Sequence, residues 1–280
     1  MPKLIPILLA LVVLLISPAA RADEAAKLYG KGVAERNAGR LKEAEATLRQ
    51  ALKLRPDYLA ARQALGHTLR RLGRLAEAAA EYQVVVAKSP ADGNTWHLLG
   101  VCHFRLGKNP EAIKALVEAS KRSPKVAEVW RDLGTAYRKA EKVADAVAAL
   151  QKAVALEPSD AESWSRLGMY LSKLGKNDAA AAAHEKAVAL KPGNAGYLFN
   201  AAAAYRRDNK RQRAIDLYEK AIQLDPKLAE AYFDLGVIYQ AENQKPKAVT
   251  MFTTFLRLAG AKLSTSERQA VEDRLRKLQQ

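Results

Sequence analysis

The sequence is poor in the residues on which most catalytic chemistry depends. It has one cysteine, Cys102, which excludes a disulfide framework and a zinc site built from cysteines. It has four histidines and no glycine-rich phosphate loop, which leaves little material for metal or nucleotide chemistry. Aromatic residues are only 6% of the chain, but hydrophobic residues are 49%, which is too high for a disordered chain. We therefore expect no catalytic residue and no cofactor.

Residues 1–22 have the pattern of a secretory signal. Lys3 precedes an apolar run from Leu4 to Ile16, and Ala20 and Ala22 place small residues where a signal peptidase reads the chain. The run is shorter than the roughly 20 residues that a membrane-spanning helix needs. We predict cleavage after Ala22 and a secreted, periplasmic protein, with an uncleaved anchor as the alternative. No cysteine follows the run, which excludes lipidation there, and no later segment has spanning length.

The predicted export affects how the charge of the chain is interpreted. The chain carries 46 Lys and Arg against 30 Asp and Glu, a formal net charge of +16. Such a charge favours binding to phosphates, anionic polysaccharides, lipid surfaces or acidic protein segments. We do not expect nucleic acid as a partner, because an exported protein does not ordinarily meet it.

The rest of the chain is one unit repeated every 34 residues. The prolines at this interval are Pro56, Pro90, Pro124, Pro158, Pro192 and Pro226. The glycines at this interval are Gly32, Gly66, Gly100, Gly134, Gly168 and Gly236, with Ala202 in the missing place. The tryptophans, Trp96, Trp130 and Trp164, share the spacing. A constant period of this length predicts a solenoid of stacked helix pairs rather than separate globular domains.

The pattern resembles the tetratricopeptide repeat (TPR) family, whose unit places Trp, Leu, Gly, Tyr, Ala, Phe, Ala and Pro at fixed offsets. The unit that starts at Ala127 carries in those places Trp130, Leu133, Gly134, Tyr137, Ala146, Leu150, Ala153 and Pro158. The resemblance implies an all-α, right-handed α-solenoid within residues 23–262, in an exported bacterial protein of this family. Its seven repeats would be 25–58, 59–92, 93–126, 127–160, 161–194, 195–228 and 229–262.

The boundaries of the helices can also be predicted. Gly39, Gly73, Gly107 and Gly175 lie between the two helices of a repeat, where a left-handed residue ends a helix. Residues 263–280 are expected to form a C-terminal capping helix that starts with a Ser264–Glu267 capping box. Its cations, expected to face solvent, are Arg268, Arg274, Arg276 and Lys277.

In the TPR family, the first helices of the repeats line a concave groove that repeat positions 2, 5, 9, 12 and 13 face. Here positions 12 and 13 are rich in cations, and position 5 carries several aromatic rings. The candidate groove residues are Arg36, Arg70, Arg71, Arg105, Arg138, Arg206, Arg207, Tyr29, His97, Phe104, Arg131, Phe199 and Phe233. Two interpretations compete: the cations bind an anionic partner, or they complement helix dipoles and keep the solenoid soluble.

We predict a non-catalytic adaptor that captures a protein or peptide with an acidic and apolar segment in this groove. By resemblance, exported bacterial relatives serve envelope assembly, pilus or secretion machinery, or polysaccharide export. The alternative is a binder of an anionic glycan or lipid surface that uses the same cations. A third possibility is self-association through the exposed solenoid ends.

The best case for a metal site is His67 and His97, at positions 9 and 5 of neighbouring repeats, with Glu128 as the one carboxylate nearby. Two histidines without a firm third ligand make a weak site, so we predict no metal site. His103, His184 and Cys102 fall at positions that are expected to be packed between helices.

Overall fold

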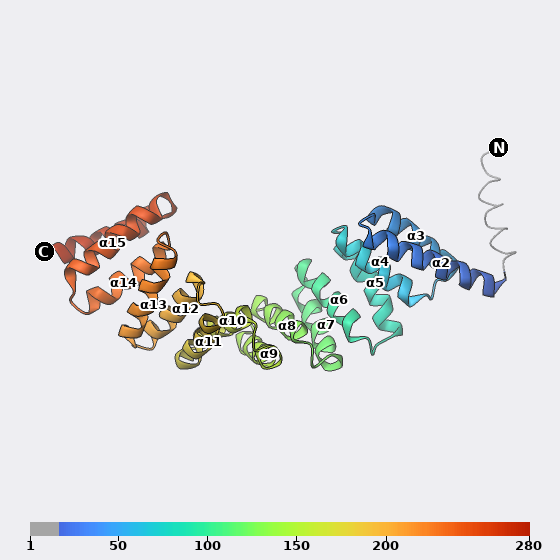
Figure 1. Ribbon diagram of the computed structural model, residues 1–280, viewed down its shortest axis with the longest axis horizontal. Coiled ribbons are helices and arrows are strands. Elements are labelled where there is room, and N and C mark those ends of the chain that lie inside the picture. The colour runs from blue at the N-terminus through green and yellow to red at the C-terminus, as the bar shows by residue number, and fades with distance from the viewer. Residues whose placement is uncertain (1–16) are drawn as a thin grey trace. The chain divides into compact units, whose positions relative to one another are not determined.

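The computed structural model describes residues 17–280, and this part of the chain consists of helices with no strand (Figure 1). The helices are α2 (Pro18–Asn37), α3 (Leu41–Leu54), α4 (Leu59–Arg71), α5 (Leu75–Lys88), α6 (Gly93–Arg105), α7 (Asn109–Arg122), α8 (Ala127–Lys139), α9 (Val143–Leu156), α10 (Ala161–Lys173), α11 (Asn177–Leu190), α12 (Ala195–Arg207), α13 (Arg211–Leu224), α14 (Ala229–Ala241), α15 (Lys245–Ala259), η1 (Gly260–Lys262) and α16 (Thr265–Gln279). The predicted all-α solenoid architecture is confirmed.

Within each of two compact units of the chain, the first helix of a repeat, helix A, packs on the second, helix B, and helix B packs on the next helix A. In the compact unit that ends at Ala140, α2 packs on α3, α4 on α5 and α6 on α7. In the unit that begins at Glu141, the pairs are α10 and α11, α12 and α13, and α14 and α15. We call these the first and the second unit.

The recurring glycines of helix A make this close pairing possible. A Cβ atom added to Gly66 would lie 2.6 Å from a ring carbon of Tyr82, and one added to Gly168 would lie 2.6 Å from Nε2 of His184. These separations are too short for a real Cβ atom, so a side chain there would push the two helices apart. The residue of helix B that faces the glycine stands at repeat position 24, and in the first, second, third, fifth and seventh repeats it lies at the centre of the helix pair. Position 24 is held by Leu48, Tyr82, Leu116, Leu150, His184, Tyr218 and Phe252.

The turns between helices A and B have the predicted left-handed residue. Gly39, Gly73, Gly107 and Gly175 have φ angles of 79°, 79°, 75° and 71°. In the other three repeats the same place is held by Glu141, Asn209 and Asn243, with φ of 60°, 56° and 58°. Asparagine tolerates this conformation because its side chain bonds locally, whereas Glu141 carries strain of about 1 kcal/mol or more.

The tryptophans and prolines that recur every 34 residues are joined by a hydrogen bond. The indole Nε1 of Trp96 donates to the carbonyl of Pro90 at 3.0 Å, and Trp130 and Trp164 donate to Pro124 and Pro158 at 2.9 Å. Arg62 and Tyr232 stand at the same repeat position and reach Pro56 and Pro226 at 3.1 and 3.3 Å. The position-4 side chain therefore fixes the turn that enters each of these repeats.

The two ends of the array differ from the repeats between them. Ser17 caps α2 by accepting a hydrogen bond from the Ala20 amide at 3.2 Å, so the predicted cleavage point after Ala22 falls within this helix. The rest of the predicted signal, residues 1–16, lies outside the described residues. No helix in residues 17–280 is both long and apolar enough to span a membrane.

The C-terminal helix α16 begins at the predicted capping box, in which Ser264 and Glu267 satisfy each other's backbone amides. Its Val271 is buried. Of the four cations expected to face solvent, Arg274, Arg276 and Lys277 are exposed, whereas Arg268 is half-buried. Arg268 donates to the carbonyl of Gly260 at 2.8 Å, and Arg274 donates to Oε1 of Gln240 at 3.0 Å. These two bonds help to hold α16 on the last repeat.

Candidate functional site

Two cavities open on the helix A face of the second unit, and both are lined by Phe199 and Asp234. The first, of about 390 Å³, lies between α10 and α12 and is also lined by Lys173 and Arg207. The second, of about 500 Å³, reaches from α14 to α15 and α16. The remaining lining of the second cavity is mostly apolar and includes Phe233, Phe255, Leu263, Ala270 and Val271. Together the cavities present aromatic rings beside charged side chains of both signs. The cations are Lys173, Arg207 and Arg274, and the carboxylates are Glu230, Asp234 and Glu267.

The rings of these cavities are held by contacts with their neighbours. Phe199 lies 5.6 Å from Tyr218 between ring centroids, and Phe233 lies 5.8 Å from Phe252 and 5.1 Å from Phe255. Phe199 and Phe233 are half-buried, so part of each ring faces the cavity. The sequence analysis missed Phe255 as a lining residue, because position 27 is not a groove position of the family. The unusual aromatic ring at a place where the family has a small residue was the available signal.

Arg206 does not line this surface as a free cation. Its Nη2 lies 3.4 Å from Oδ1 of Asp234, and Oδ2 of the same aspartate accepts a hydrogen bond of 2.6 Å from the Tyr218 hydroxyl. Burial, with Asp234 as the next cause, raises the pKa of Tyr218. These three residues form a polar network that links α12, α13 and α14, which we call the Asp234 network.

The equivalent residues of the first unit form no such network. Arg70 is half-buried and close enough to the fully buried Tyr82 to lower the pKa of that residue, but the Tyr82 hydroxyl has no hydrogen-bond partner of normal geometry among residues 17–280. Arg36 lies near the same group of residues. Burial is the main cause that lowers the pKa of His67, and the positive charges of Arg36 and Arg70 lower it further. Arg71 donates to the Arg36 carbonyl at 2.6 Å. The structure thus brings three predicted groove cations together.

The remaining predicted groove residues have different surroundings. Tyr29 is half-buried, packs against the first unit's core and lies 5.2 Å from the Tyr58 ring. Phe104 and Arg131 are half-buried, and Arg105, Arg138 and Arg207 are exposed. Phe104 faces neither cavity of the second unit, since it belongs to α6.

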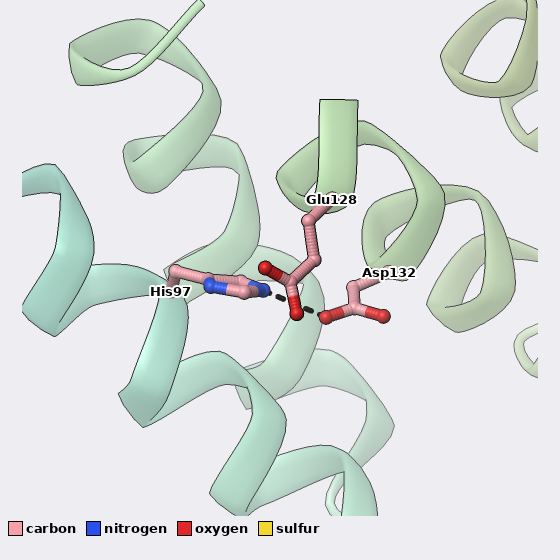
Figure 2. A group of neighbouring side chains, drawn as sticks. All are labelled: His97, Glu128 and Asp132. Carbon is pink, nitrogen blue, oxygen red and sulfur yellow. Dashed lines mark hydrogen bonds and ion pairs between the residues drawn. The ribbon is translucent and has the colours of Figure 1, made fainter. Parts of the chain in front are cut away.

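His97 lies on α6 and is buried, with an exposed fraction of 8%. Its partner is not His67 but Asp132 of α8, whose Oδ2 lies 2.7 Å from His97 Nε2. Glu128, one turn earlier on α8, points toward the same place (Figure 2). His67 instead packs edge-on against Tyr82, with ring centroids 5.7 Å apart. The nomination of Glu128 as a neighbour of His97 was correct, and Asp132 was missed.

Two buried titratable groups belong to the core, as predicted. Cys102 is fully buried, and burial raises the pKa of its thiol, which makes it a poor nucleophile. His184 is 2% exposed, and burial, with Arg207 as a smaller cause, lowers its pKa to about 4. Its Nδ1 has no hydrogen-bond partner among the described residues.

Helix pairs stacked in register, with a cavity-lined face of A helices, define an α-solenoid of the helical-repeat class. The model of the cilia and flagella-associated protein 70 C-terminal domain, a TPR model, matches residues 58–274, which is more than half of the chain. A tetratricopeptide repeat model matches residues 19–93. The chain belongs to the tetratricopeptide repeat family. Proteins of this family are generally scaffolds without catalytic activity.

Solved TPR structures have the same fold. MamA is 28% identical with a TM-score of 0.55, and the match covers 59% of this chain and 97% of MamA. YrrB, described as a TPR protein with an unusual peptide-binding site, is 23% identical with a TM-score of 0.61, over 66% and 95% of the two chains. PilF of Pseudomonas aeruginosa is 20% identical with a TM-score of 0.58, over 79% and 99%. A search of curated proteins gives no match.

Proposed function

We propose that this protein is a non-catalytic adaptor that binds an extended or helical segment of another protein on the helix A face of its second unit. The observation that carries the proposal is the pair of cavities that share Phe199 and Asp234. An apolar side chain of the partner would enter the cavity between Phe199, Phe233 and Phe255. An acidic side chain further along the partner would lie beside Lys173 and Arg207.

The physical case rests on rings that are already in place. Aromatic side chains held by their neighbours lose little entropy on binding, and buried aromatic contacts dominate the energy of most interfaces. Cations at the rim act mainly by steering an acidic partner and fixing its direction. YrrB, which shares the fold, is described as having a peptide-binding site, which supports a peptide as the type of ligand.

A peptide array tests the proposal. The full-length protein would be incubated with peptides in which aromatic or aliphatic residues and acidic residues are placed at systematic separations. We expect selection of peptides that combine both, and a loss of binding of about tenfold or more for Phe233→Ala. Lys220→Glu, at an exposed position on helix α13, is the matched control and should bind like the wild type. Equal binding by Phe233→Ala and the control would overturn the proposal.

An anionic polymer as ligand is a second candidate, supported by the cations of the first unit. Arg36, Arg70 and Arg71 lie together on this unit, since Arg71 donates to the Arg36 carbonyl and Arg36 and Arg70 both act on the pKa of His67. Binding of this kind depends on charge alone, so it should vanish at high salt, whereas a peptide with an apolar anchor should retain part of its affinity. The salt dependence of binding to an anionic polysaccharide and to the selected peptides separates the two.

We also propose that the protein acts in the cell envelope, in envelope assembly, pilus or secretion machinery, or polysaccharide export. The support is the signal-like pattern of residues 1–22, which would be removed before α2 folds, since the cleavage point lies inside that helix. N-terminal sequencing of the protein from fractionated cells tests this. A mature chain that starts at Asp23 in the periplasmic fraction is expected, and an intact Met1 in the cytoplasm would exclude export.

A further inference from the structure

The group of His97, Glu128 and Asp132 lies apart from the cavities of the second unit and suits a metal ion. His97 comes from α6, and both carboxylates come from α8 (Figure 2). One possible ligand atom from each residue lies within 4.8 Å of the other two. We propose that these three side chains bind one divalent transition-metal ion, with Zn²⁺ as the probe, between the A helices of the third and fourth repeats.

The local fold places the three ligands without strain. Glu128 and Asp132 are four residues apart on one helix, so they share a face, and that face points toward α6. His97 is only 8% exposed, and the packing around its ring fixes the direction of Nε2. Ligand atoms that each lie about 2 Å from a zinc ion are about 3 to 4 Å apart. The observed cluster therefore needs only a small opening of the 2.7 Å contact between His97 and Asp132.

The chemistry of the three donors narrows the class of ion. One imidazole nitrogen and two carboxylate oxygens suit a borderline ion such as Zn²⁺, Mn²⁺ or Fe²⁺, whereas Ca²⁺ and Mg²⁺ prefer oxygen donors alone. For binding, Nε2 of His97 must release its proton and keep one on Nδ1. Three protein ligands leave an open coordination position for water or for a side chain of a partner.

A comparison within the chain shows why a plain ion pair is an incomplete account of this cluster. Asp234, at the same repeat position as Asp132, pairs with the Arg206 cation and accepts a hydrogen bond from Tyr218. The residues that correspond to those two, Phe104 and Leu116, have no polar side-chain atom to donate. His97 supplies at most one positive charge to two converging carboxylates, and like charges at close range repel. A bound divalent cation would compensate the negative charge of the two carboxylates.

Zinc binding to the full-length protein, produced without a histidine tag and stripped with chelator, tests the site. We expect one ion per chain by titration calorimetry, and a Co²⁺ complex with visible absorption bands. His97→Gln and Asp132→Asn should each weaken zinc binding by roughly tenfold or more. His67→Gln is the matched control, since His67 lies in the same unit, packs against Tyr82 and is absent from the cluster, and it should bind like the wild type.

A third variant separates loss of the site from loss of the fold. Glu128 is exposed, so Glu128→Gln should leave the circular dichroism spectrum and thermal midpoint unchanged while it weakens zinc binding. Zinc binding that is equal in the wild type and in the His97→Gln/Asp132→Asn double variant would overturn the proposal. So would weakening by His67→Gln to the same extent as by His97→Gln.

Discussion

Arg70 in the first unit and Arg206 in the second stand at the same position of their repeats, each beside a tyrosine at position 24. In the second unit, Asp234 bonds both the tyrosine hydroxyl and the arginine. In the first unit, the residue four repeats earlier than Asp234 is Leu98, which packs against the core. One residue on the neighbouring repeat therefore decides whether the arginine has a carboxylate partner within its unit.

This difference changes how a column of cations should be interpreted. From the sequence, the arginines at position 12 would be interpreted as equivalent binding cations. In the structure they differ, because Arg206 pairs with Asp234 and Arg70 has Leu98 at the corresponding place. Charge that is matched inside the fold contributes to stability, and unmatched charge contributes to steering and binding. Arg70 has the second role in our proposal, and Arg206 has the first.

Removing Asp234 should have the largest effect on this comparison. Asp234→Ala leaves the buried hydroxyl of Tyr218 and the half-buried Arg206 without their acceptor. We expect the free energy of unfolding to fall by about 3 kcal/mol, because unpaired buried polar groups keep their desolvation penalty. Urea unfolding followed by circular dichroism measures it, with Asp216→Ala, at an exposed position of the same unit, as control. Similar losses for both variants would show that the Asp234 network is not a stabilising element.

The second unit should also respond to acid through His184. The folded-state pKa of this buried imidazole is about 4, below the ordinary value of about 6.5, so the fold favours the neutral form. Its contribution is fully present above about pH 6.5 and is lost as the pH falls toward 4. The linkage predicts a loss of about 2 kcal/mol between pH 7 and pH 5.

His184→Leu is the control for this effect, because leucine occupies position 24 in the first, third and fourth repeats. We expect urea midpoints of the variant to change less between pH 7 and pH 5 than those of the wild type. His67 and His103 of the first unit also have pKa values lowered by burial, and they remain in both proteins, so the difference isolates His184. An identical pH dependence of the two proteins would exclude His184 as the acid-sensitive group.

The fold could be predicted from sequence because its determinants recur at a fixed interval. The glycine that faces position 24, the left-handed turn residue and the proline–tryptophan bond each depend on residues within one repeat or at its border. Repetition shows which positions require a small residue, since Ala202 is the one departure from glycine at its position. The ends of helix B in each repeat and the capping box of the C-terminal helix follow from the same local rules.

The candidate sites could be predicted only in part, because they depend on pairs of residues from different repeats. Family positions indicated Phe199, Phe233 and Arg207, but the sequence does not show that Asp234 neutralises Arg206. It also placed Glu128 near His97 and missed Asp132, because position 6 is not a groove position of the family. The signal was present in the spacing, since His97 and Asp132 are 35 residues apart, as are Ser165 and Asn200, which also contact.

The smallest effect, and the most direct test of the comparison, comes from removing one oxygen atom from each tyrosine. Tyr218→Phe removes a 2.6 Å hydrogen bond to Asp234 and should lower the free energy of unfolding by about 1.5 kcal/mol. Tyr82→Phe removes a fully buried hydroxyl that has no hydrogen bond of normal geometry within the described chain, although Arg70 lies close to it, so we expect a change within about 0.5 kcal/mol, or a gain.

The two variants make the same chemical change at equivalent positions, so packing losses cancel in their difference. Urea unfolding at pH 7 provides the measurement, and the Leu98→Asp background sharpens it. In that background the first unit acquires a carboxylate where the second has Asp234, and Tyr82→Phe should then become destabilising. A loss for Tyr82→Phe in the wild type that equals the loss for Tyr218→Phe would mean that Arg70 already satisfies the Tyr82 hydroxyl. The cation of the first unit would then be a structural group like Arg206.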